Sequence, residues 1–270
     1  MKSISMHNLA PVLFIPHGGG PLPLLGDPGH QEMNEFLIEM AQRFNKPAAI
    51  IVISAHWEEE IPTITGSQLP PLIYDYYGFP DEAYDIEYPV KGDSALAHKL
   101  FSLLKENGIS AKLDDQRGLD HGVFVPLKIM YPQADIPCVQ LSLCRSLDPE
   151  FHIQIGKALA ALRQDNVLVV GSGFSFHNLR SFFATNDQAA NKSNIDFEDW
   201  LIHACTDREI TEAQREKLLI EWESAPFARF CHPREEHLLP LHVCYGMAQS
   251  AASLVFQGKI LGKKASAYLW

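Results

Sequence analysis

The stretch AAIIVISAHW, residues 48–57, decides the fold class of this 270-residue chain. Residues 48–54 are small or apolar without alternation, as in a strand of a sheet that helices cover on both faces. Three other runs share this character, namely residues 12–15, 136–143 and 166–171. We therefore predict four buried strands in a central, mostly parallel sheet.

Helical patterns alternate with these strands. Their signals are aspartate caps, apolar residues at helical spacing and glycine stops. The predicted helices cover residues 93–107, 148–163, 196–223 and 237–254, and the third range is predicted as two helices broken near residues 207–211. This alternation over the whole length predicts one α/β domain spanning residues 1–270. Residues 59–90 and 182–194 are predicted as loops, and the first is long enough to form a lid or a binding wall.

The composition excludes several classes of protein. A hydrophobic fraction of 46% with 20% charged residues is typical of a globular chain and excludes long disorder. The net charge of −11 argues against nucleic acid and anionic membranes as partners, because both select basic patches. No apolar run approaches the roughly 18 residues of a membrane helix, and the one near the start is too short for a secretion signal. The five cysteines form no CxxC pair, so we expect neither disulfides nor a cysteine zinc site. Free cysteines suit a reducing compartment, so we expect a cytoplasmic location. The sequence carries no signal for an oligomeric state.

Histidines follow three of the predicted strands. His17 stands in FIPHGGGP, His56 in VISAHW and His177 in VVGSGFSFHNL. The carboxyl ends of parallel strands share one edge of a sheet, where ligands bind in open α/β folds. Neighbouring strands lie about 5 Å apart, so we expect the three imidazoles to converge on one point.

A fourth cluster, CHPREEHLLPLH at residues 231–242, adds His237 at the start of a predicted helix. Neutral imidazoles bind zinc and iron well, and three of them with an open position form a catalytic metal site. His121 in GLDHGVFVPL is predicted to be a substrate-facing donor oriented by Asp120, with a metal ligand and a helix cap as alternatives. Five other histidines lie in predicted tails, turns or surface helices, and we expect structural roles for them: His7, His30, His98, His152 and His203. We expect a structural role for His242 as well.

Six ordered blocks carry a resemblance to a known family. They are HGGGP (17–21), SAHW (54–57), YDYYGFPDEAYDIEYP (74–89), DHGVFVPL (120–127), GSGFSFHNL (171–179) and HPREEHLLPLH (232–242). Together they resemble the class III extradiol ring-cleavage dioxygenases, and most of all the branch similar to DOPA 4,5-dioxygenase. The resemblance covers roughly residues 11–270.

The resemblance implies a three-layer αβα sandwich and Fe(II), with Zn(II) sometimes in the same site. His17, His56 and His237 match the family's metal ligands. His177 matches an acid/base beside the metal that can become a fourth ligand when zinc is bound, and His121 matches a histidine that faces the substrate. Better-known members use two histidines and a glutamate, which leaves Glu235 or Glu236 as an alternative third ligand.

The implied reaction opens the ring of a catechol-type substrate with O2 beside the diol, giving a semialdehyde. An imidazole can exchange protons near neutral pH, so His177 can take the catechol proton and later return one. An aromatic pocket wall is predicted from Trp57, Tyr74, Tyr76, Tyr77 and Phe79, with simple packing as the alternative. Candidates for binding a substrate carboxylate are Arg117, Lys128, Arg145 and Arg180.

Two other functions remain open from the residues alone. A zinc-dependent hydrolase could use the same histidines, because such a site lowers the pKa of a bound water to about 7. A binding protein on the same fold, without redox chemistry, is the other.

Overall fold

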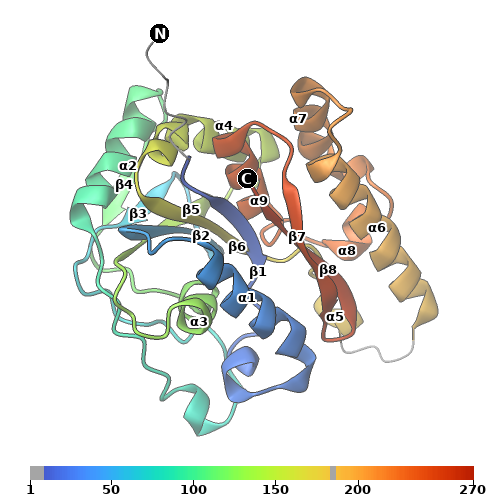
Figure 1. Ribbon diagram of the computed structural model, residues 1–270, viewed down its shortest axis with the longest axis horizontal. Coiled ribbons are helices and arrows are strands. Elements are labelled where there is room, and N and C mark those ends of the chain that lie inside the picture. Colours follow the sequence, from blue (N-terminus) through green and yellow to red (C-terminus); the bar gives the residue numbers. More distant parts are fainter. Residues whose placement is uncertain (1–8, 183–186) are drawn as a thin grey trace.

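An eight-stranded sheet forms the centre of the protein in this computed structural model, which describes residues 9–182 and 187–270 (Figure 1). The strand order is β4-β3-β5-β2-β6-β1-β8-β7. The strands are β1 Val12–Pro16, β2 Ala49–Glu59, β3 Thr63–Thr65, β4 Lys112–Asp114, β5 Cys138–Cys144, β6 Val167–Gly173, β7 Ser253–Ile260 and β8 Lys263–Leu269. The four predicted strands are confirmed as β1, β2, β5 and β6, and these are parallel neighbours in the middle of the sheet.

Helices cover both faces of this sheet, which makes a three-layer αβα sandwich (Figure 1). α3 lies against β2 and β6 and beside α1, whereas α9 packs on β1, β2 and β6 from the other face together with α4. Both faces of the central strands are therefore buried, as their apolar runs predicted: every residue of β1, β5 and β6 is buried. The helices are α1 Gln31–Arg43, α2 Ser94–Glu106, α3 His121–Met130, α4 Pro149–Leu159, α5 Leu179–Phe182, α6 Gln188–Thr206, α7 Glu212–Ile220, α8 Ala228–Cys231 and α9 Leu239–Ala248.

The C-terminal part differs from the prediction. A helix was expected over residues 237–254, but α9 ends at Ala248 because Gln249 adopts a left-handed conformation with φ 48°. Residues 253–269 form the hairpin β7–β8, which extends the sheet antiparallel beside β1. The mixed exposure along β7 explains why its sequence carried no buried-strand signal.

The loop predicted at residues 182–194 was also partly wrong. α6 begins at Gln188, where the Asp187 side chain accepts the Ala190 N–H and caps the helix. Residues 183–186 of that loop, and His7, lie outside the described residues. The predicted break near residues 207–211 is confirmed, since Thr211 and Gln214 form a capping box at the start of α7. In the described part of the chain, no helix is long and apolar enough to cross a membrane.

Candidate metal centre

Three histidines from distant parts of the chain meet at the carboxyl edge of the central strands. His17 directly follows β1, and His237 stands two residues before α9. His56 lies inside β2 rather than after it, because the strand continues to Glu59 past an irregularity opposite β5. One ring nitrogen of each histidine lies within 4.8 Å of the others. Of the three histidines expected to converge here, His17 and His56 do so, and His237 rather than His177 completes their group.

The Nδ1 atom of each of the three rings lies beside a polar partner. Ser172 Oγ donates to the Gly122 carbonyl, so it accepts from His17 Nδ1 at 3.1 Å. His237 Nδ1 lies 2.9 Å from Glu236 Oε1, and His56 Nδ1 lies 3.5 Å from a carboxylate oxygen of Asp75. These partners favour the tautomer with the proton on Nδ1, by hydrogen bonds for His17 and His237 and by the nearby carboxylate for His56, which leaves Nε2 free to bind a metal.

The distance between two of these donor atoms fits a metal site. His17 Nε2 and His56 Nε2 are 3.0 Å apart. With both protons on Nδ1, this contact brings two lone pairs together, which a shared cation would stabilise. Two nitrogen ligands about 2.1 Å from an ion and at right angles to each other would lie about 3 Å apart. The donor set therefore fits a divalent transition metal.

Burial keeps these histidines neutral. It is the main reason why the pKa values of His17, His56 and His237 lie well below the ordinary value of 6.5, and repulsion among the clustered imidazoles lowers them further. A neutral imidazole is the form that binds a metal.

His121, the first residue of α3, lies beside this cluster. Its ring centre is 3.9 Å from that of His56. Asp75 Oδ1 accepts both its Nδ1–H and its backbone N–H, each at 2.9 Å. The expectation that Asp120 orients this ring is wrong, because the Asp120 carboxylate is occupied by other donors: Ser54 Oγ, Gln140 Nε2 and Arg117. Burial opposes the ionisation of Asp75, but the hydrogen bond and charge of His121 lower the Asp75 pKa to about 2.

His177 stacks on His237, with ring centres 3.4 Å apart and planes inclined by 15°. Its Nδ1 lies 3.3 Å from Glu236 Oε1, the same oxygen that contacts His237. His177 thus groups with Glu236 and His237 rather than with His17 and His56. Glu235 instead pairs with Arg229 at 2.5 Å.

An open pocket of about 440 Å³ lies on the His177 side of the cluster. Its lining residues come from two segments and are His177, Asn178, Leu179, Arg180, Pro233, Arg234 and Glu236. The pocket therefore gives a small molecule access to the His177 side of the cluster.

The tyrosine-rich segment approaches the cluster from another side. Within this segment, Tyr76 is the residue that packs beside the cluster, and its ring centre lies 5.8 Å from that of His121. Tyr76 also packs against Phe79 of the same segment, with ring centres 5.5 Å apart. Tyr77 does not fit the predicted wall, since it is 91% exposed. The hydroxyls of Tyr74 and Tyr76 donate to backbone carbonyls within the segment, so they help to hold it folded.

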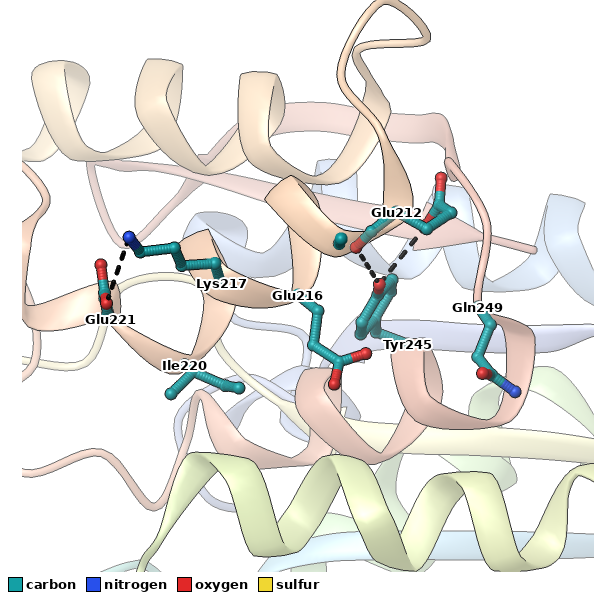
Figure 2. A pocket seen from close by; sticks show the side chains of 8 residues that line it. Glu212, Glu216, Lys217, Ile220, Glu221, Tyr245 and Gln249 are labelled. Atoms are coloured by element: carbon teal, nitrogen blue, oxygen red, sulfur yellow. Dashed lines mark hydrogen bonds and ion pairs between the residues drawn. The ribbon is translucent and has the colours of Figure 1, made fainter.

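A second groove, of about 500 Å³, lies between α7 and α9 (Figure 2). Several of its polar groups pair with one another: Tyr245 donates to Glu212, and Lys217 pairs with Glu221 at 3.9 Å (Figure 2). None of the clustered histidines lines it. It is therefore a less suitable catalytic site.

The remaining histidines make structural contacts. His30 is fully buried and accepts the Gly19 N–H at 3.0 Å, so it supports the glycine loop after His17. His152 and His242 are buried and bond to the backbone, whereas His98 and His203 are exposed on helices.

Sequence reasoning missed Asp75 and Ser172, which hold the histidine rings. Ser172 had a signal, because it is a polar residue inside an otherwise apolar strand and its hydroxyl needs a partner. Asp75 had none, since an acid within a loop of tyrosines and prolines is ordinarily exposed to water.

Comparisons with known proteins match nearly the whole chain. Residues 12–269 match the family described as the catalytic LigB subunit of aromatic ring-opening dioxygenase. The chain is 40% identical to the dioxygenase tasH of Hapsidospora irregularis, over 97% of this chain and 86% of the relative. It is 36% identical to a 4,5-DOPA dioxygenase extradiol of Beta vulgaris, over 93% of this chain and 92% of the relative. A crystal structure of an uncharacterized protein from Escherichia coli K12 superposes with a TM-score of 0.78 at 28% identity, covering 96% of this chain and 99% of the other.

Proposed function

The chain belongs to the LigB family of aromatic ring-opening dioxygenases, and we propose that its histidine cluster holds the metal for this reaction. It is a non-haem extradiol dioxygenase that acts on an aromatic substrate with O2. This membership favours ring cleavage over the zinc hydrolase and the non-catalytic binding protein. Among the structural observations, the convergence of three imidazoles at one sheet edge carries the proposal.

The proposed ligands are His17, His56 and His237, with Fe(II) as the working metal and Zn(II) able to occupy the same donor set. Three imidazoles leave about half of an octahedral coordination sphere for a catechol and O2. Fe(II) would supply the redox chemistry that lets O2 react with an aromatic diol. His237 suits the third position better than the adjacent glutamates, because Glu236 contacts Nδ1 of His237 and Glu235 pairs with Arg229.

His177 is the proposed acid/base. Its Nδ1 side is taken by Glu236, so Nε2 is the atom available to a catechol hydroxyl. His177 takes a proton as the substrate binds, the Glu236 carboxylate stabilises the imidazolium, and the proton returns as the ring opens to a semialdehyde. His177 could still become a fourth ligand when zinc is bound.

His121 is proposed to contact the substrate from the opposite side. Asp75 holds its Nδ1, so Nε2 faces the cluster, and in its protonated form the ring donates a hydrogen bond from that atom. We also propose that residues 1–270 form one catalytic domain, and the single sheet supports this proposal. The cytoplasmic location stays a prediction.

The experiment combines metal analysis with turnover. Protein loaded anaerobically with Fe(II) is offered a panel of catechols and O2, and we expect a yellow ring-opened product. His177→Ala should abolish turnover while the metal stays bound, whereas His17→Ala and His56→Ala should lose the metal. His203→Ala, at an exposed position of α6, is the matched control. Full metal content in both ligand variants would refute the proposed site.

A further inference from the structure

Within residues 9–182 and 187–270, the pocket beside His177 carries one cation, Arg180, without a carboxylate partner. We propose that Arg180 binds an anionic substituent of the aromatic substrate and so makes the enzyme prefer carboxylated over neutral catechols. This inference rests on the proposed function of the histidine cluster.

The charges that line the pocket single out Arg180. Arg234, the other arginine, forms a two-pronged ion pair with Glu58, at 2.5 and 2.6 Å. Glu236 is engaged by His177 and His237. Arg180 is exposed and has no carboxylate within 4.0 Å among the described residues. The residues outside the described ranges, 1–8 and 183–186, include no Asp or Glu that could serve as its partner.

Arg180 is also tied to the segment that carries the acid/base. The His177 N–H bonds to the Cys231 carbonyl at 2.9 Å, and Asn178 Nδ2 donates to the Phe230 carbonyl at 2.7 Å. These bonds anchor residues 177 and 178 to the segment that forms the other pocket wall. Arg180 follows two residues later within α5, where its exposed side chain lines the pocket.

The other candidate cations are committed elsewhere. Arg117 bonds to Asp120, Lys128 donates to the Glu87 carbonyl, and Arg145 pairs with Glu60. None of these three lines the pocket. In a chain of net charge −11, an anionic substrate meets general repulsion, so a local cation at the entrance has a marked effect on which catechol binds.

The substrate geometry agrees with this placement. A catechol that binds through its two hydroxyls directs a substituent at ring position 4 away from the metal. Because His177 lines the pocket together with Arg180, a substituent that extends past His177 would enter this pocket, where a carboxylate could form a charge-assisted pair with the guanidinium.

The test compares charged and neutral substrates in matched variants. The kcat/KM is measured for 3,4-dihydroxybenzoate and 3,4-dihydroxyphenylacetate against catechol and 4-methylcatechol. In Arg180→Gln we expect the preference for the carboxylated pair to fall about five- to tenfold, mainly through KM, because the ion pair is partly exposed. Arg180→Lys should keep part of the preference for carboxylated catechols, because it retains the positive charge. Arg208→Gln, which removes an exposed charge from the α6–α7 turn, is the control and should leave the ratio unchanged.

A binding measurement separates this inference from the proposed function. Without O2, titration calorimetry of Fe(II)-loaded protein should give a lower Kd for 3,4-dihydroxybenzoate than for catechol, and Arg180→Gln should remove that difference. If wild-type protein binds both equally or does not bind the carboxylated catechol, the role of Arg180 is refuted. An equal loss for charged and neutral catechols in Arg180→Gln would refute it too. Preferential binding without ring opening in air would contradict the proposed function but support the anion site.

Discussion

The imidazole rings of His177 and His237 lie nearly parallel, 3.4 Å apart, and their Nδ1 atoms face the same oxygen of Glu236. Because both Nδ1 atoms point to one carboxylate oxygen, both Nε2 atoms face away from it. The nitrogen proposed to bind the metal and the nitrogen proposed to move the substrate proton therefore lie side by side. One carboxylate orients both.

Glu236→Gln should impair both functions at once. Removing the charge weakens the hold on both rings, so we expect metal affinity to fall about 10- to 100-fold, as is common when a partner of a metal-binding histidine is lost, with a parallel fall in kcat. Metal titration and steady-state kinetics test this. Glu235→Gln, in the neighbouring glutamate that pairs with Arg229, should change neither quantity much. Equal behaviour of the two variants would show that Glu236 does not orient the rings.

Ser172→Ala should weaken the metal site through the His17 tautomer. Without the hydroxyl, His17 Nδ1 loses its acceptor, and we expect metal affinity to fall about tenfold. The matched control is Ser142→Ala, in the adjacent part of the sheet, where a buried hydroxyl accepts the Thr63 N–H at 3.0 Å. Both variants should lose about 1–3 kcal/mol of stability from an unmade buried hydrogen bond. If both retain wild-type metal affinity, Ser172 does not select the tautomer.

Gly18→Ala should displace the loop that follows His17. Gly18 has φ +83°, and an added Cβ would lie 2.6 Å from Pro23 Cγ and 2.9 Å from His30 Cδ2. Gly26→Ala is the control, because its φ of +76° is similar but nothing lies within 4 Å of its Cβ position. Each substitution should cost about 1–2 kcal/mol for the left-handed backbone. We expect Gly18→Ala to cost more in denaturant unfolding and to lower metal content. A Gly18→Ala protein indistinguishable from Gly26→Ala in both measurements would contradict this.

Glu198 should make the protein less stable as pH rises toward neutrality. This side chain on α6 is fully buried, and burial raises its pKa from 4.5 to about 7, although Ser266 donates a hydrogen bond to it. Below pH 4.5 it is protonated in both the folded and unfolded states. Between pH 4.5 and 7 the unfolded state releases this proton first, so stability falls across that window and stays reduced above it.

The Glu198→Gln variant isolates this effect. The free energy of unfolding is measured by denaturant titration at pH 5 and pH 8 for both proteins. The decrease between the two values should be smaller in the variant by up to about 2.5 kcal/mol, which is the part of the effect of a pKa raised from 4.5 to about 7 that falls between pH 5 and pH 8. Identical pH dependence of the two proteins would show that Glu198 ionises normally in the folded state.

The centre of the fold and the candidate ligands could be predicted because their signals are local. A strand buried on both faces must be apolar over consecutive residues, and β1, β2, β5 and β6 are. In parallel neighbours such strands end at one edge, so histidines placed at their ends were expected to meet. The hairpin β7–β8 escaped prediction because β7 lies at the edge of the sheet and is largely exposed, which leaves little apolar pattern.

Tertiary structure alone decided which groups orient the histidines. Ser172 is 155 residues from His17, and Asp75 is 46 residues from His121. Such pairs arise from the order of strands in the sheet and from the path of the tyrosine-rich segment over its edge, and neither leaves a periodic trace in the sequence. The sequence by itself determined which residue types stand at the strand ends. The packing of distant segments determined which nitrogen of each ring is free to bind, because a tautomer depends on its hydrogen-bond partner.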